Sequence, residues 1–220
     1  MSFAPSSKPR SYKRSEPRKP PRPMDAARLE EMALAYVARF ATSAGKLRAY
    51  LRRKLRERGW QGPDGADPED ARGGEALAEG FGRAEALVER FVAVGYVDDE
   101  SFAKARSGSL QRRGFGTRRI VEELGAAGIE EELRERVLPG EGAQRRAALA
   151  LARKRRFGPF GVGASDPAVR QKQIAAMLRA GHGLEAARRL VSAASPEDAE
   201  RWVEEAGEDE SDDGEAGAGW

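Results

Sequence analysis

Residues 114–129, GFGTRRIVEELGAAGI, contain the signals for a turn and for the helix that follows it. Gly114 and Gly116 can adopt backbone angles that other residues avoid, so they predict the turn. Thr117 is a residue type that caps helix starts, and apolar residues behind it recur at intervals of three and four positions. These apolar residues are Ile120, Val121 and Leu124. The stretch therefore predicts an amphipathic helix over 117–127.

The end of this helix follows a pattern that occurs elsewhere in the chain. Leu124 lies four residues before Gly128, and Ile129 follows the glycine. A left-handed glycine just past a helix, with the next residue folded back on the apolar residue, is the Schellman ending. The same grouping occurs at Leu55, Gly59 and Trp60, at Phe91, Gly95 and Tyr96, and at Met177, Gly181 and His182. Four uses of one stop signal predict a tandem helical repeat.

No segment shows the alternation of a strand, so we expect an all-α fold. Its three tandem three-helix repeats would form an elongated, curved helical body with disordered charged tails. The expected helices span 29–41, 46–58 and 83–94 in the first repeat, 99–112, 117–127 and 130–138 in the second, and 142–156, 166–180 and 184–194 in the third.

Composition sets the expected boundaries of these repeats. Proline, serine and cations before Met24, and acid, glycine and alanine after Val203, leave too little apolar surface to fold. The segment 61–80 is expected to be a flexible insertion, unless its portion GEALAEG forms a short helical turn. The expected domains are a disordered basic arm 1–23, repeat 1 over 24–98, repeat 2 over 99–140, repeat 3 over 141–203 and a disordered acidic tail 204–220.

The small net charge of +3 conceals a segregation of charge along the chain. Residues 1–23 have seven basic side chains against one acidic, whereas residues 197–220 have eleven acidic side chains against Arg201. A basic body between a basic arm and an acidic tail indicates an anionic partner, but such charge also serves solubility. Charge alone leaves both alternatives open.

Several kinds of chemistry are excluded or disfavoured. The chain has no cysteine, which excludes disulfides, zinc-thiolate sites and thiol nucleophiles. The single histidine, His182, stands where Trp60 and Ile129 stand at other helix ends, so we expect it to pack. The segment GFGTRR lacks the ending of a P-loop, which is a lysine followed by serine or threonine. No apolar run reaches the ~20 residues that a membrane span needs. We expect a soluble, cytoplasmic protein without enzymatic activity or cofactor.

The segment 95–103, GYVDDESFA, places two aspartates side by side, which could bind a metal or begin a helix. Asp98 follows a helix stop and precedes the next apolar stripe, so its side chain can cap exposed N–H groups. Asp99 and Glu100 then favour the positive end of the helix. A metal site would need a third or fourth ligand at fixed spacing, and none is nearby. We therefore expect capping and no metal.

Basic clusters are the remaining signal. Segment 46–58, KLRAYLRRKLRER, has seven cations and one acid. Segment 153–156, RKRR, lies at the end of another expected helix. The turn GFGTRR has two arginines before it, Arg112 and Arg113, and contains Arg118 and Arg119. One sign of charge dominates these helices, which favours contact with phosphates or with an acidic protein surface over an ordinary solvated face. The candidate DNA- or protein-binding residues are Arg52, Arg53, Arg56, Arg112, Arg113, Arg118, Arg119, Arg153, Lys154, Arg155 and Arg156.

GYVDDESFA followed by GFGTRRIVEELGAAGI resembles the signature of the RecX family, regulatory proteins of the RecA recombinase. Members run Gly-Tyr-hydrophobic-Asp-Asp and Phe-Ala, then Gly-x-Gly-x-x-Arg-Ile, Glu-Leu and Gly-Ile. The resemblance spans about residues 30–195. The matching residues, mainly structural, are Gly95, Tyr96, Asp98, Asp99, Phe102, Ala103, Gly114, Gly116, Arg119, Ile120, Leu124, Gly128 and Ile129.

This resemblance implies three helical repeats, no catalysis, and binding along the RecA filament on single-stranded DNA. It also implies suppression of ATP hydrolysis and strand exchange, hence a role in DNA repair, recombination and the SOS response. Direct DNA binding and a monomeric state are further expectations. The alternatives are a helix-turn-helix type DNA-binding regulator and a protein-only helical scaffold. The scaffold leaves the arginines without a role.

Overall fold

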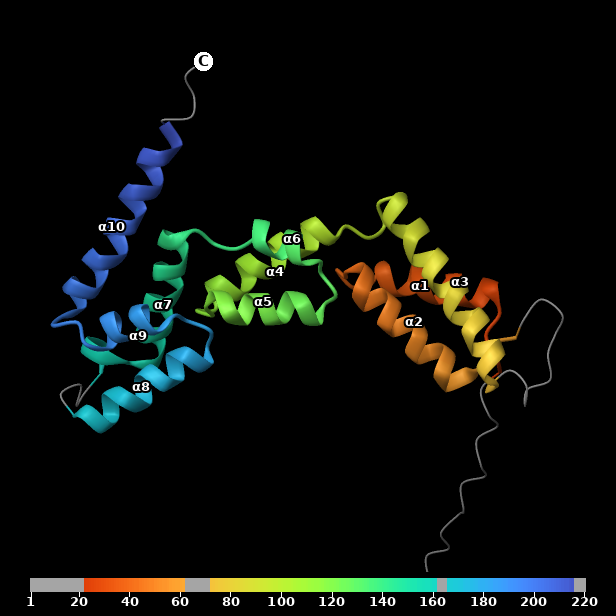
Figure 1. Cartoon of the computed structure of the whole chain (residues 1–220), viewed down its shortest axis with the longest axis horizontal. Helices are drawn as coiled ribbons and strands as arrows, with labels where there is room; N and C mark the ends of the chain where they lie inside the picture. Colours follow the sequence, from red (N-terminus) through yellow and green to blue (C-terminus); the bar gives the residue numbers. More distant parts are fainter. Residues whose placement is uncertain (1–21, 62–71, 162–165, 216–220) are drawn as a thin grey trace, which may run out of the picture.

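The computed structural model describes residues 22–61, 72–161 and 166–215, with the backbone alone over 207–215. Within these ranges the chain is helical and has no strand beyond one isolated bridge between Met24 and Trp60. Figure 1 shows an elongated arrangement in which successive helices form successive groups. The α-helices are α1 (Ala26–Val37), α2 (Ala44–Arg58), α3 (Gly74–Ala93), α4 (Asp99–Arg112), α5 (Thr117–Ala126), α6 (Glu131–Arg136), α7 (Glu141–Arg155), α8 (Pro167–Arg179), α9 (Leu184–Val191) and α10 (Pro196–Glu215), and a 3-10 turn, η2 (Gly158–Phe160), precedes α8.

The all-α fold class is confirmed, and a helix occurs at each of the nine expected places. For the expected insertion at 61–80, the alternative of a helical GEALAEG is the correct one over 74–80, because α3 begins at Gly74 and includes this segment. Alanine, leucine and glutamate are good helix formers, and Leu77 and Phe81 pack against the adjacent core. Residues 62–71 of the expected insertion lie outside the described residues.

The end of the folded body also differs from the expectation. Residues 204–215, expected to be disordered, continue α10, and Val203 and Ala206 are buried. The helix packs lengthwise on α7, so its apolar residues extend the core by about one turn beyond Val203. Figure 1 shows α10 projecting from the body beyond this contact. Residues 1–21 of the expected arm and 216–220 of the expected tail lie outside the described residues.

The buried apolar side chains of the described residues form three clusters rather than one continuous core. The N-terminal cluster is built by α1, α2 and α3 around Leu51 and Phe91. The central cluster is built by α4, α5 and α6 around Ile120 and Leu124. The C-terminal cluster is built by α7 to α10 around Met177. This division agrees with three units in sequence order, and their status as repeats stays a prediction.

Among the described residues, Schellman endings occur at four glycines, all with positive φ. The residue after each glycine donates its N–H to the carbonyl five residues earlier, from Tyr96 to Phe91 (2.9 Å), Phe115 to Leu110 (3.0 Å), Ile129 to Leu124 (3.1 Å) and His182 to Met177 (3.2 Å). At Gly59 the expected ending is wrong. Its φ of 87° and ψ of 170° lie outside the left-handed helical region, and the neighbouring Trp60 pairs with Met24 instead.

The end of α7 and the start of α5 also differ from the glycine ending and from the expected cap. At the end of α7, Phe157 N–H donates to the Ala152 carbonyl at 2.8 Å, and the left-handed residue between them is Arg156, with φ 56°. Among described residues it is the one non-glycine with positive φ, a conformation that costs an L-residue about 1–2 kcal/mol. At the start of α5 the cap is Gly116, so Thr117 is the first helical residue and not the cap.

Close glycine contacts join the three clusters at two junctions. At the first junction, a Cβ on Gly45 of α2 would lie 2.6 Å from the Ala127 carbonyl oxygen and 2.7 Å from Gly128 Cα. At the second junction, a Cβ on Gly116 would lie 2.4 Å from the carbonyl carbon of Gly181. Only residues without a side chain let backbones approach this closely, which accounts for glycine at these positions.

Candidate nucleic-acid and protein interface

The candidate cations divide into those with an acidic partner in the described structure and those without one. Arg53 pairs with Glu57 at 3.7 Å, Arg119 with Glu122 and Glu123, and Arg153 with Glu200. The remaining candidates are exposed and make no ion pair within the described residues, namely Arg52, Arg56, Arg112, Arg113, Arg118, Lys154, Arg155 and Arg156. These eight candidates are therefore available to an external anion.

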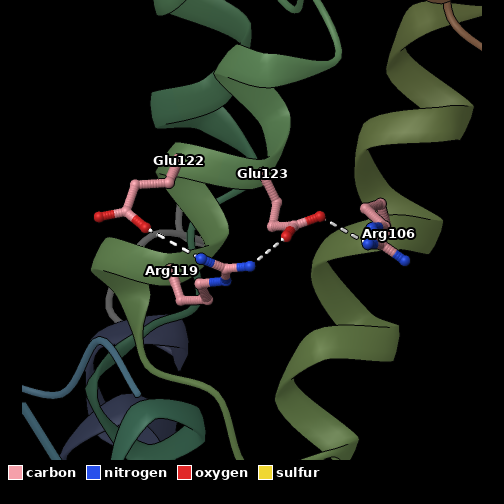
Figure 2. A network of polar contacts seen from close by, with 4 residues as sticks. All are labelled: Arg106, Arg119, Glu122 and Glu123. Carbon is pink, nitrogen blue, oxygen red and sulfur yellow. Dashed lines mark hydrogen bonds and ion pairs between the residues drawn. The ribbon is translucent and has the colours of Figure 1, made fainter. Parts of the chain in front are cut away.

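Arg119 belongs to an internal network that links α4 to α5. Figure 2 shows its guanidinium between Glu122 and Glu123, with Glu123 also accepting from Arg106. The Arg119 Nη2 to Glu123 Oε1 distance is 2.7 Å, and the Arg106 Nη2 to Glu123 Oε2 distance is 2.6 Å. The hydrogen bond from Arg106 is the main reason that the pKa of Glu123 lies below its usual value. The signature arginine thus pairs with acids of its own helix, and Arg106 makes the link from α4 to Glu123.

Two of the basic clusters come together in space, and the third does not. Gly114 lies against the backbone of Leu151, so a Cβ on it would be 3.1 Å from the Leu151 nitrogen. This contact sets the end of α4, with Arg112 and Arg113, beside the C-terminal half of α7. The α7 end supplies Lys154, Arg155 and Arg156. We call these five cations the basic corner. Arg52 and Arg56 of α2 belong instead to the N-terminal cluster, where both lie over the Phe81 ring.

Helix α10 occupies three other arginines of the C-terminal part. Arg145 donates to the Trp202 carbonyl oxygen at 2.7 Å and lies over the Trp202 ring, with Cζ 4.6 Å from its centroid. Arg153 pairs with Glu200, and Arg189 donates two hydrogen bonds to Asp198 at 3.0 and 3.1 Å. The bond from Arg189 chiefly lowers the pKa of the Asp198 carboxyl. This helix, absent from the sequence-based interpretation, therefore neutralises part of the basic surface.

A groove of about 530 Å³ lies beside the first junction and was missed by the sequence analysis. Phe40 and Tyr96 line the groove, and their side chains are 52% and 59% exposed. Lys46 and Phe102 also line it, and the Lys46 Nζ lies 4.9 Å from the centroid of the Phe102 ring. Exposed aromatic residues at helix ends carry no distinctive spacing, so periodicity could not mark them. The signature residue Tyr96 stacks edge-on against Phe91 at 5.3 Å, which is one reason for an aromatic there.

The adjacent aspartates have the structural role that was expected. Asp98 accepts from Ser101 N–H at 2.9 Å and from the Ser101 hydroxyl at 2.6 Å, and this hydroxyl bond chiefly lowers the pKa of Asp98. Asp99 has a role that the sequence did not indicate, because its Oδ1 accepts from Ala44 N–H across the first junction at 2.8 Å. The described residues contain no cluster of three or more metal-ligating side chains.

His182 packs, as expected, and also ties two helix corners together. It is 4% exposed, and its Nε2 lies 3.0 Å from the Gly114 carbonyl oxygen. Burial lowers the pKa of its imidazole, so the ring is neutral at pH 7.

No described helix is both long and apolar enough to cross a membrane.

Comparison with known proteins matches these features to one family. Residues 98–138 match the family model described as RecX, second three-helix domain. The chain is 32% identical over 181 residues to the regulatory protein RecX of Myxococcus xanthus, covering 79% of this chain and 89% of that protein. It is 38% identical over 125 residues to the regulatory protein RecX of Thermus thermophilus, covering 57% of this chain and 70% of the relative.

A solved structure has a similar fold. The crystal structure of RecX from Lactobacillus salivarius aligns with a TM-score of 0.51 at 14% identity, over 76% of this chain and 94% of that one. At this identity the likeness concerns the fold alone. The family follows from the sequence relatives, above all from the Myxococcus protein, whose length this chain nearly spans. The chain belongs to the RecX family of regulatory proteins.

Proposed function

We propose that this protein is a non-enzymatic regulator of the RecA recombinase. It binds as a monomer along the RecA filament on single-stranded DNA, contacts DNA directly, and suppresses ATP hydrolysis and strand exchange. Family membership supports the class of function, and the name of the relatives supports a RecA-related partner. The consequence for the cell is regulation of DNA repair and recombination.

One observation carries this proposal beyond the family name. Eight candidate cations are exposed and without an acidic partner among the described residues, on a body that Figure 1 shows as elongated. Exposed arginines and lysines without an acidic partner are suited to phosphate oxygens and to acidic protein surfaces. An elongated shape presents such side chains to several units of a filament at once, so one bound molecule can affect many RecA subunits.

The test is RecA ATP hydrolysis on single-stranded DNA with the protein well below the RecA concentration. The wild type should lower turnover, and the triple variant R112E, R113E, R118E should lose most of this effect, because reversed charge repels an anion. Arg119 is left intact because it already pairs with Glu122 and Glu123 of its own helix. The matched control reverses three cations of α8, R170E, K172E and R179E, with the same change in net charge.

The outcomes separate three explanations. Loss of inhibition in the α4–α5 variant alone supports a contact role for these arginines. Equal loss in both variants would mean that only net charge matters. If the wild type leaves RecA turnover unchanged at equimolar protein but binds a short duplex sequence-selectively, the helix-turn-helix type DNA-binding regulator replaces this proposal.

A further inference from the structure

Arg156 occupies a position where the fold favours glycine. The endings at Gly95, Gly114, Gly128 and Gly181 have the same hydrogen-bond pattern, and in each the left-handed residue has no side chain. At the end of α7 an arginine takes that conformation, with φ 56° and ψ 49°. A left-handed arginine is strained, and glycine would remove the strain at this point. The strain indicates that the guanidinium has a role of its own.

No internal contact of the described structure explains the arginine. Arg156 is exposed and makes no ion pair there, whereas Arg153 on the preceding turn is neutralised by Glu200 of α10. Its neighbours Lys154 and Arg155 are also exposed and unpaired. The three unpaired cations therefore follow one another at the helix end, immediately beyond the arginine that α10 occupies.

The geometry of the helix end indicates the kind of anion. Consecutive helical residues project about 100° apart, so Lys154 and Arg155 point to different sides of α7, and Arg156 leaves the helix. A flat acidic protein surface could meet one of these directions at a time. A flexible chain with an anion at every unit can pass over the helix end and meet all three. Gly114 also holds the end of α4 beside α7, which adds Arg112 and Arg113 along the same path.

We propose that the end of α7 is a phosphate-backbone contact for single-stranded nucleic acid, with Arg156 retained for this contact at the expense of stability. This deepens the proposed function, on which it rests for the class of ligand. Such contacts carry no base specificity and weaken as salt rises, because counterions are released from the strand on binding. The remaining cations of the basic corner extend the contact toward α4.

The test uses the full chain without RecA and a fluorescein-labelled oligothymidine as the probe. R156G removes both charge and strain, R156Q removes charge but keeps the strain, and R156K keeps both. Each is measured for affinity by fluorescence anisotropy across a salt series and for Tm by thermal unfolding. The matched control is R146Q, at an exposed and unpaired arginine earlier on the same helix.

We expect R156G and R156Q to weaken binding alike, about three- to tenfold at low salt, and to reduce the salt slope by about 0.7 for one lost phosphate contact. R156G alone should raise Tm, by about 2–4 °C, whereas R156K should match the wild type in both measurements. R146Q should bind as the wild type does.

Four results would overturn the inference. The first is unchanged oligothymidine affinity in R156G and R156Q, and the second is equal weakening in R146Q, which would reduce the effect to net charge. The third is no rise in Tm for R156G, which would remove the argument from strain. The fourth comes from a separate titration of the same variants with RecA protein: weakened binding to RecA with unchanged oligothymidine binding would assign the site to an acidic protein surface. A wild type that binds the probe as described but does not inhibit RecA would refute the proposed function and leave this contact intact.

Discussion

At both junctions two glycines bring backbone into contact, but different groups hold the contact. The first junction relies on side chains, because the Ser43 hydroxyl donates to the Ala127 carbonyl oxygen at 2.5 Å and Asp99 accepts from Ala44 N–H. The second relies mainly on backbone, because Gly116 N–H donates to the Ala180 carbonyl oxygen at 2.9 Å and Arg118 N–H to the Gly181 carbonyl oxygen at 3.1 Å. The bond between His182 and the Gly114 carbonyl oxygen adds a side chain to it. The first junction can therefore be weakened by removing a polar group, and the second mainly by adding a side chain.

The largest effect is expected from a methyl group at the second junction. In G181A the residue must keep a φ of 93°, and its Cβ would lie 2.5 Å from the backbone nitrogen of Arg119. Conformational strain and the backbone clash together should destabilise the protein by about 3–4 kcal/mol. G128A at the first junction should follow closely, since its Cβ would lie 2.8 Å from Gly45 Cα at a φ of 75°. Urea unfolding measures both.

G95A separates strain from clash. Gly95 has a φ of 78°, similar to that of Gly128, but nothing lies within 4 Å of an added Cβ. This variant should lose only about 1–2 kcal/mol, the cost of the left-handed conformation. If G95A and G181A lose equal stability, the close approach of Gly116 and Gly181 does not hold the second junction.

A smaller effect is expected from removing the hydroxyl group at the first junction. Ser43 is fully buried, donates to the Ala127 carbonyl oxygen and accepts from Lys46 N–H at 3.2 Å. S43A should cost about 1–2 kcal/mol, because a buried carbonyl and a helix-start N–H lose their partner. T42V is the matched control, since the buried Thr42 hydroxyl makes only a 3.4 Å contact, and it should cost less than about 0.5 kcal/mol. Similar losses in the two variants would show that the Ser43 bond contributes little.

The sequence predicted the helices and several helix ends because the signals are local. The apolar spacing of Ile120 and Leu124 and the glycine after them need no knowledge of the rest of the chain. The junctions were not predicted, because Gly45 lies just before the expected helix 46–58 and Asp99 was interpreted only as an acid that favours a helix start. Their roles depend on the distant neighbours Gly128 and Ala44. Helix α10 was missed because its buried residues are few and its many acids resemble those of a disordered tail.

The candidate site was predicted in composition but not in arrangement. A run of cations such as RKRR is visible in any sequence, but the acid that neutralises Arg153 lies on α10, far along the chain. Arg119 differs, because its partners Glu122 and Glu123 lie three and four residues along the same helix, whereas Arg106 reaches Glu123 from another helix. Which cations remain available is a property of tertiary structure, and local pattern does not contain it.

The smallest expected difference between the junctions is a pH response confined to the second one. Burial lowers the folded-state pKa of His182 below its usual value of 6.5, so the unfolded chain binds this proton more readily than the folded protein. Stability from this group is present above about pH 6.5 and is lost as pH falls through the lower folded-state pKa. The loss should stay under about 1.4 kcal/mol for each pH unit, and H182Q should remove it. Arg118, Glu141, Arg145 and Glu185 line the pocket beside His182, so the comparison with H182Q at each pH isolates the contribution of the histidine. Hydrogen exchange provides the local readout: after correction for intrinsic rates, protection should fall with acid at the Gly116 and Arg118 amides but not at Ala44. Equal loss at all three amides would mean that His182 does not act through the second junction.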